Sequence, residues 1–384
     1  MTGLTRGSVA VVGAAESDLG QVAPGTTPLD LMAQATARAL DDCGLNLRDV
    51  DGVFTAASQL RMPTLALCEY LGLRPRYQDS TQIGGSSFMS HLSHAMAAIE
   101  HGLCEVALIA YGSTQRSVSR AAASPREFNP YESPYRPFMP ATAYALAASR
   151  HMHQFGTTRT HLAEVAVAAR QWALMNPVAW EKEPLTIAQA LAARMVSFPL
   201  TVRDCCLVND GGGAIIVTSA ARAKTLRQKP TYVLGVGECM SHMNISAMPD
   251  LTTTGAAQSG AAAFAMAKLT AKDVNSVQVY DAFTINTILF LEDLGFCPKG
   301  EGGNFVANGG IAPGGHLPVN TSGGGLSYCH PGMYGLLVLI EAIRQIRGDC
   351  GPRQTPNCTI ALAHGNGGVL SSQATVVFGS GAAV

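Results

Sequence analysis

Hydrophobic positions along the first hundred residues alternate between two patterns. Continuous apolar runs at residues 9–12, 53–55 and 106–110 are typical of short strands that are buried on both faces. Between these runs, apolar side chains recur at helical spacing after Pro28 and again after the glycine-serine stretch 84–87. Strands that alternate with helices in this way predict a largely parallel sheet with helices on its faces.

The same alternation resumes after an interruption. Residues 113–140 are rich in proline, arginine, serine and aromatics, and three helical segments follow at 143–153, 161–176 and 187–195 before the next strand at 213–218. An insertion of this length in an α/β domain usually forms a lid or a binding loop. We therefore expect residues 113–200 to cover the entrance of a site and to shape its pocket.

A second series of elements occupies the rest of the chain. The pattern predicts strands at 233–237, 277–280, 359–363 and 374–378, helices at 261–269, 284–294 and 336–346, a loop at 305–318 and a turn at 364–368. In both series a helix that follows glycines precedes an apolar strand. This shared order predicts two similar α/β halves, residues 1–222 with the insertion and residues 223–384.

Composition and charge exclude several classes of function. The 384 residues are 47% hydrophobic and 14% charged with a net charge of −1, so we expect neither nucleic acid nor an anionic membrane as a partner. No apolar run approaches the roughly 20 residues of a membrane-spanning helix, and the first residues lack the layout of a signal peptide. These features predict a cytoplasmic protein. The ten cysteines are scattered without metal-ligand spacing, so no metal site is expected.

The stretch 320–335, NTSGGGLSYCHPGMYG, concentrates residue types that are common in binding sites. Its glycines, Gly324 among them, allow positive φ and let a ligand approach the main chain closely. Pro331 suits the first turn of the predicted helix, which would place His330 at a helix start, where backbone N–H groups bind anions. The stretch therefore predicts either a site for an anion or a developing oxyanion, or a plain glycine-rich turn capped by a histidine.

Common nucleotide and hydrolase motifs fail in this sequence. Met240 stands where a GxGxxG that begins at Gly235 needs its third glycine, and Phe88 breaks a GxSxG elbow. What remains is a set of loops that a parallel sheet places at the carboxyl ends of its strands. These loops carry Gly85, Ser86, Tyr280, Asp281, residues 328–330, His364 and Gly367. Together they predict a shared site, although packing or helix capping would also explain each residue taken alone.

Several longer motifs resemble the thiolase superfamily, in particular the non-decarboxylating branch of the sterol-carrier-protein thiolases and their aldolase relatives. The resemblance extends over essentially the whole chain. It is carried by residues 84–88, 200–206 with 210–211, YDAFT at 280–284, EDLGFC at 292–297 with KGEG at 299–302, and the stretches 320–335 and 364–368. It implies an α/β thiolase fold of two pseudo-repeated βαβαβαββ halves in a five-layer α-β-α-β-α arrangement.

The departures from the family pattern concern the residues that carry thiolase chemistry. A thiolase has a nucleophilic cysteine about where Gly85 or Ser86 stands, and an acid–base cysteine in the loop where this chain has His364. Tyr280 replaces the asparagine of the usual Asn-Glu-Ala-Phe motif and is followed by Asp281, whereas the His-Pro pair persists at His330. The resemblance therefore implies a thiolase scaffold that has lost its acyl-enzyme chemistry.

The function that this favours is retro-aldol cleavage of the α–β carbon bond of a 3-hydroxyacyl-CoA through an enolate, as in lipid or steroid side-chain degradation. The related aldolases suggest a catalytic tyrosine, which makes Tyr280 the first candidate and Tyr328 or His330 the second. The candidate positions for binding the substrate or stabilising the enolate oxygen are Gly85, Ser86, Asp281, Gly324 and Gly367.

Two alternatives stay open at this point. Cys329, beside His330 near a predicted helix start, could be a relocated nucleophile, which would make the chain a 3-ketoacyl-CoA thiolase or an acetyl-CoA acetyltransferase. The chain could also be a non-catalytic subunit that binds acyl-CoA. The resemblance further implies a homodimer, a small OB-fold partner with a zinc ribbon that binds acyl-CoA, no bound cofactor, and coenzyme A only as part of the substrate.

Overall fold

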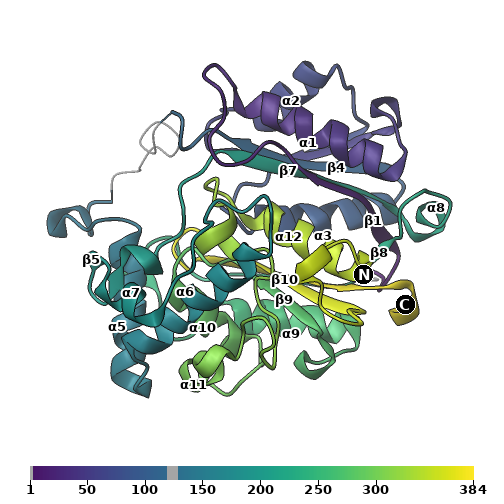
Figure 1. Ribbon diagram of the computed structural model, residues 1–384. Helices are drawn as coiled ribbons and strands as arrows, with labels where there is room; N and C mark the ends of the chain where they lie inside the picture. Colours follow the sequence, from purple (N-terminus) through teal and green to yellow (C-terminus); the bar gives the residue numbers. More distant parts are fainter. Residues whose placement is uncertain (1–2, 119–128) are drawn as a thin grey trace.

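The computed structural model describes residues 3–118 and 129–384 (Figure 1). Nine strands form one mixed sheet: β1 (Val9–Glu16), β2 (Gly52–Thr55), β3 (Tyr77–Asp79), β4 (Val106–Ser113), β7 (Gly211–Ser219), β8 (Thr231–Met240), β9 (Ser276–Val279), β10 (Ile360–Gly367) and β11 (Ser372–Gly379). Their order across the sheet is β3-β2-β4-β7-β1-β8-β11-β10-β9, and β5 (Met195–Ser197) pairs separately with β6 (Leu200–Thr201).

The helices surround and separate the strands. They are α1 (Pro28–Cys43), α2 (Pro63–Leu71), α3 (Ser87–Glu100), α5 (Ala141–Phe155), α6 (Arg159–Leu174), α7 (Ile187–Ala192), α8 (Ala220–Ala223), α9 (Ala256–Ala267), α10 (Thr284–Asp293), α11 (Gly302–Val306) and α12 (Gly335–Arg347). Within the described ranges no helix is both long and apolar enough to span a membrane.

The large sheet bends into two half-sheets that enclose a pair of helices. Only a short antiparallel contact, Ala10 with Tyr232 and Val11 with Thr231, joins β1 to β8. Figure 1 shows α1 and α2 outside β4 and β7, α3 and α12 in the middle, and α9 to α11 outside the second half-sheet. Both α3 and α12 contact strands of both half-sheets. This is the predicted five-layer thiolase fold. The prediction of a largely parallel sheet is wrong, because only the pairs β2–β3, β2–β4 and β9–β10 are parallel and the remaining pairs of the large sheet are antiparallel.

The two central helices are buried through their apolar side chains. In α12 the run Leu336–Ile340 is at most 1% exposed, and in α3 the side chains of Phe88, Leu92 and Met96 are fully buried. Large apolar side chains of this kind are stable only inside a core. The prediction that these two helices lie between two sheets is therefore confirmed, whereas the domain boundary between residues 222 and 223 stays a prediction.

Two predicted local features near the site are wrong. The helix α12 begins at Gly335 and not at Pro331, because Tyr111 Oη donates to Pro331 O at 2.5 Å and accepts from Met333 N at 3.0 Å, which holds this segment outside the helix. The predicted turn 364–368 is mostly strand, because the β10–β11 ladder continues as far as the pair Gly367–Ser372. The pattern also missed α2, β3, β5, β6, α8 and α11.

The insertion forms a helical layer beside the second half. Helices α5 and α6 pack against α10, and α6 also contacts the π-helical turn Gly324–Tyr328. The predicted loop 113–140 includes residues 119–128, which lie outside the described residues. The part that is described brings the insertion against the turn 324–328, within the stretch 320–335 that the sequence singled out.

Candidate active site

Tyr280 lies directly after β9 and is the centre of the site. Its ring meets the rings of His330 and Tyr334 edge to face, at centroid distances of 5.5 and 5.6 Å. Its hydroxyl donates to Gly332 O at 2.8 Å and accepts from Tyr334 N at 3.2 Å. Burial, and to a lesser extent the nearby Cys206 thiol, raises the pKa of Tyr280 well above its ordinary value. The phenol is therefore a weaker acid than an ordinary tyrosine and keeps its proton at neutral pH.

Gly85 packs directly under the Tyr280 ring. A Cβ atom at position 85 would lie 2.0 Å from Cε2 of Tyr280 and 2.7 Å from the carbonyl oxygen of Asn366. Both distances are far inside van der Waals contact, so no side chain fits there in this conformation. Of the two positions at which the sequence located the missing nucleophile, 85 and 86, the first has its side-chain space filled by the ring of Tyr280.

Ser86 is buried and occupied by structural hydrogen bonds. Its hydroxyl donates to Ile83 O at 2.9 Å and lies 2.9 Å from Ser372 Oγ. Gly367 packs against the same turn, because a Cβ on Gly367 would lie 1.6 Å from Ile83 O. Both partners of the Ser86 hydroxyl are neutral oxygens, which cannot activate it as a nucleophile.

His330 follows the π-helical turn and is 6% exposed. Its backbone is clamped by Asn209: His330 N donates to Asn209 Oδ1, and Asn209 N donates to His330 O, both at 3.2 Å. The imidazole stacks against the Tyr334 ring at a centroid distance of 5.8 Å. The structure thus brings His330 and Tyr280 together as predicted, but in an extended segment and not at a helix start.

Asp281 explains the glycines of the stretch 320–335. Its carboxylate accepts from Gly325 N at 2.6 Å and Leu326 N at 3.4 Å, and a Cβ on Gly324 would lie 2.0 Å from Asp281 Oδ2. The sequence predicted that a ligand approaches the main chain at Gly324. In the structure the carboxylate of Asp281 lies there instead. Burial outweighs these N–H donors and raises the pKa of Asp281 to about 7.

Tyr328 and Cys329 point away from Tyr280 into other contacts. The Tyr328 hydroxyl donates to Glu16 Oε1 at 2.8 Å, and Arg344 pairs with the same carboxylate. The Cys329 thiol lies 3.8 Å from Asp210 O, and burial raises its pKa far above the ordinary value. A thiol in this environment is not an activated nucleophile.

His364 lies on the other face of its strand. Its neighbour Gly365 faces α3, since a Cβ there would lie 2.6 Å from Met89 Sδ, so the strand pleat directs His364 to the opposite side. There the imidazole packs on Phe290 and is hydrogen-bonded through both ring nitrogens, to Thr375 Oγ1 and Gln373 Oε1, each at 2.9 Å. Burial lowers its pKa to about 4. The structure does not bring His364 to the Tyr280 ring.

Two residues near the site, Tyr144 and Cys206, were not among the candidate site residues of the sequence analysis. Tyr144 lies on α5 and stacks on Phe283 at a centroid distance of 4.4 Å, and its hydroxyl accepts from Asn366 Nδ2 at 3.0 Å. Cys206 interacts electrostatically with both Tyr144 and Tyr280. Tyr144 sits among the alanines of a helix and matches no motif, so only its position in space identifies it.

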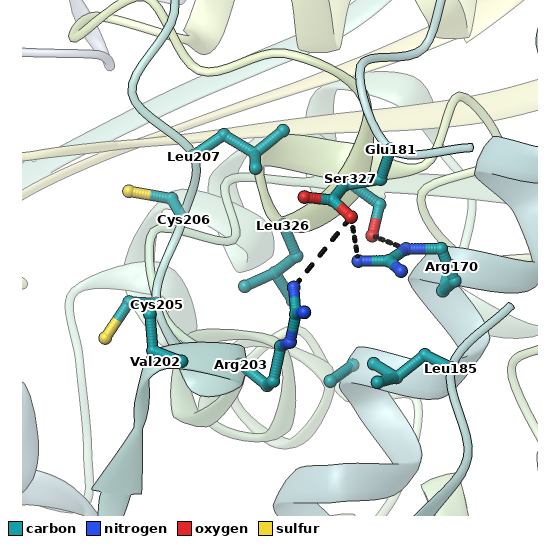
Figure 2. A pocket seen from close by; sticks show the side chains of 11 residues that line it. Arg170, Glu181, Leu185, Val202, Arg203, Cys205, Cys206, Leu207, Leu326 and Ser327 are labelled. Atoms are coloured by element: carbon teal, nitrogen blue, oxygen red, sulfur yellow. Dashed lines mark hydrogen bonds and ion pairs between the residues drawn. The ribbon is translucent and has the colours of Figure 1, made fainter. Parts of the chain in front are cut away.

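A cavity of about 210 Å³ lies next to these residues (Figure 2). Arg170 forms an ion pair with Glu181 at 2.8 Å and donates to Ser327 Oγ at 3.1 Å, while Arg203 lies 3.8 Å from the same glutamate. Leu326, whose N–H reaches Asp281, forms part of the wall. The cavity is therefore lined on one side by the insertion and on the other by residues that adjoin the site.

Comparisons with known proteins agree on one family. The family model described as "Thiolase C-terminal domain-like" matches residues 237–380. The 17-hydroxy-3-oxo-4-pregnene-20-carboxyl-CoA lyase of Mycobacterium tuberculosis is 33% identical over 89% of this chain and 92% of its own length. The acetyl-CoA acetyltransferase of Methanothermobacter thermautotrophicus is 31% identical over 96% of this chain and 99% of its own length.

A solved structure extends this likeness to three dimensions. The Ltp2-ChsH2(DUF35) aldolase matches with a TM-score of 0.87 and 27% identity, over 98% of this chain and 99% of the other. These findings confirm the predicted superfamily and the prediction of an enzyme. The chain belongs to the thiolase superfamily, in the branch that includes the sterol-carrier-protein thiolases and the thiolase-like aldolases.

Proposed function

We propose that this enzyme cleaves the α–β carbon bond of a 3-hydroxyacyl-CoA by a retro-aldol reaction. The β-hydroxyl loses its proton, its oxygen forms a carbonyl, and the α–β bond breaks with its electron pair passing to the thioester as an enolate. Protonation of the α-carbon then yields the shorter acyl-CoA. The products together contain every atom of the substrate, so the reaction needs neither free CoA nor an oxidant.

The observation that carries this proposal is the packing of Tyr280 on Gly85. It leaves no room at position 85 for the thiol that thiolysis requires. The other thiol that the sequence offered, Cys329, is buried with a raised pKa. A reaction that forms no acyl-enzyme fits a site in which position 85 carries no side chain and the Cys329 thiol is buried.

The two facing rings divide the proton transfers between them. His330 accepts the proton of the β-hydroxyl, and the resulting imidazolium stabilises the charge that develops on the enolate. Tyr280, which keeps its proton at neutral pH, donates that proton to the α-carbon. His330 then returns its proton to Tyr280, whose ring lies 5.5 Å away by centroid distance, and the site is reset.

The cavity beside the site fits one part of an acyl-CoA. Its wall includes Val202, Leu185 and Leu326, which suit an alkyl segment, and the side chain of Arg203 is 41% exposed and suits an anionic group. In this proposal coenzyme A enters as part of the substrate, and residues of the insertion shape its binding.

We further propose that the enzyme works as a homodimer with a small OB-fold partner that carries a zinc ribbon. The matching aldolase structure is named for two components, Ltp2 and ChsH2(DUF35), which supports a partner for this chain too. Co-expression with candidate partners, followed by size measurement and activity assay, tests this part separately.

The experiment that tests the function supplies panels of 3-hydroxyacyl-CoA and 3-ketoacyl-CoA thioesters, with and without free CoA, and identifies the products. Retro-aldol cleavage gives a carbonyl compound and a shorter acyl-CoA from the hydroxy substrates in the absence of CoA. Strict dependence on CoA with 3-keto substrates would instead establish the acetyltransferase alternative, which the relative from Methanothermobacter thermautotrophicus favours. No turnover with any panel or partner would favour a non-catalytic subunit.

A further inference from the structure

A continuous chain of buried side chains runs from α5 across two strands to α9. Asn366 Nδ2 donates to the Tyr144 hydroxyl at 3.0 Å, and Gln373 Nε2 donates to Asn366 Oδ1 at 2.9 Å. Beyond Gln373 the chain continues through His364 and Thr375 to Ser259, with each contact 2.9 Å long. All six side chains are at most 2% exposed.

In this series of hydrogen bonds each donor points toward the Tyr144 end. The amide oxygen of Gln373 can only accept, so His364 carries its proton on Nε2 and donates to it. The neutral imidazole then accepts at Nδ1 from the Thr375 hydroxyl. At the other end, Tyr144 accepts from Asn366 and must turn its own proton elsewhere, toward Gly368 O at 3.2 Å. The direction of each hydrogen bond is thus set by its neighbour.

The series of hydrogen-bonded side chains includes Asn366, near the end of β10. This end of β10 packs on the Gly84–Ser86 turn. The carbonyl oxygen of Asn366 would lie 2.7 Å from a Cβ on Gly85, and Gly367 Cα would lie 2.6 Å from a Cβ on Gly84. The Tyr144 hydroxyl forms hydrogen bonds to residues on both sides of Gly367. It accepts from the side chain of Asn366 and donates to the backbone carbonyl of Gly368. Gly85 is thereby pressed between β10 and the Tyr280 ring.

We propose that Tyr144 is a positioning residue for the reaction. Its hydroxyl fixes the end of β10, β10 fixes the Gly84–Ser86 turn, and the turn fixes the ring of Tyr280 against its reacting partners. The inference rests on the proposed role of Tyr280. It also assigns His364 a task other than proton transfer to substrate, namely to orient the amides that hold Tyr144.

The test compares Tyr144→Phe with the wild-type enzyme, and Tyr232→Phe serves as a matched control. Tyr232 is equally a buried tyrosine, 4% exposed, but lies on β8. Tyr144→Phe keeps the stacking on Phe283 and loses both hydrogen bonds. We expect kcat for retro-aldol cleavage to fall about 10- to 100-fold, with KM changed less than about threefold, because displacing a reacting group by about 1 Å costs rates of this size. Tyr232→Phe keeps the wild-type rate.

Hydrogen–deuterium exchange gives a readout that does not depend on turnover. Peptides that cover residues 82–90 exchange faster in Tyr144→Phe and unchanged in Tyr232→Phe. Unchanged exchange, or a raised KM with normal kcat, overturns the positioning role. If the wild type cleaves no 3-hydroxyacyl-CoA, the proposed function fails and exchange alone decides this inference. Should Tyr144→Phe not fold, Asn366→Ala, which has no donor for the Tyr144 hydroxyl, is expected to give the same two effects.

Discussion

The ring of Tyr280 occupies the space that any side chain at position 85 would need, with its Cε2 atom 2.0 Å from the place of a Cβ on Gly85. Glycine at 85 and tyrosine at 280 are therefore a matched pair. In the thiolase pattern that the chain resembles, the corresponding pair is a cysteine in the same turn and an asparagine in place of Tyr280. The dependence is steric and runs one way: the tyrosine at 280 requires a glycine at 85 in this conformation, whereas a glycine at 85 leaves room for a smaller residue at 280.

Placing a cysteine at position 85 tests this coupling. Gly85→Cys should lower the free energy of unfolding by about 1–3 kcal/mol, because the new side chain must displace the Tyr280 ring. In a Tyr280→Asn background the same substitution should cost at least about 1 kcal/mol less. Denaturant unfolding of the wild type, both single variants and the double variant measures this difference. Equal costs in the two backgrounds would show that the residues are not coupled.

His330→Ala should lower kcat on the order of 10²- to 10³-fold while KM changes little. The imidazole acts only as charge develops on the enolate, so its removal raises the barrier more than it weakens substrate binding. Steady-state kinetics with a cleaved 3-hydroxyacyl-CoA measures both constants. A large rise in KM with an unchanged kcat would assign His330 to binding alone.

Tyr280→Phe should cause a rate loss comparable to that of His330→Ala without unfolding the protein. The substitution removes one hydroxyl, which bonds Gly332 O and Tyr334 N, and leaves the ring packed on Gly85. Kinetics and a thermal melt recorded on the same preparation separate the two effects. A wild-type rate in this variant would remove Tyr280 from the mechanism.

Cys329→Ala separates cleavage from thiolysis. An aldolase should keep most of its kcat and run without CoA, because the buried thiol lies against Asp210 O and takes no part in the reaction. Turnover and CoA dependence are measured for the variant and the wild type side by side. If Cys329→Ala abolishes turnover and Tyr280→Phe does not, the aldolase assignment is wrong.

Asp281 should make stability fall as the pH rises. Its folded pKa of about 7 lies above the unfolded value of 3.8. Between these values the folded protein holds a proton that the unfolded chain has released. The stability that this proton provides is complete below the unfolded pKa and is lost as the pH rises through the folded pKa. The three-unit shift corresponds to a loss on the order of 4 kcal/mol.

Asp281→Asn removes this titration and keeps an oxygen acceptor for Gly325 N. The free energy of unfolding of the wild type relative to this variant should therefore fall between about pH 4 and pH 7 and then level off. Denaturation curves across this range measure the difference. The exposed Asp41→Asn variant controls for the loss of one surface charge, and a parallel pH dependence in both variants would contradict the assignment.

The order of strands and helices was readable from the sequence because each element carries its own periodicity. The runs 9–12 and 106–110, which became part of β1 and β4, and the run 336–340, which opens α12, are continuously apolar, and such runs favour burial. The stretch 320–335 and the tyrosine at 280 were also found in advance, because glycine-rich motifs and a changed family motif are local signals. Each of these predictions rests on one short segment of neighbouring residues, the longest being the stretch 320–335.

What the tertiary structure alone decided is which way the side chains point and what they touch. His364 and Gly365 are neighbours in sequence, but the pleat of β10 sends one to the α10 side and the other to α3. Helix α12 starts four residues after Pro331 because Tyr111, 220 positions earlier, holds the intervening backbone. The fit of Tyr280 on Gly85 and the link from Tyr144 to Asn366 likewise join residues that are far apart in sequence. Local periodicity fixes the elements, whereas contacts between distant residues arise only when the elements pack.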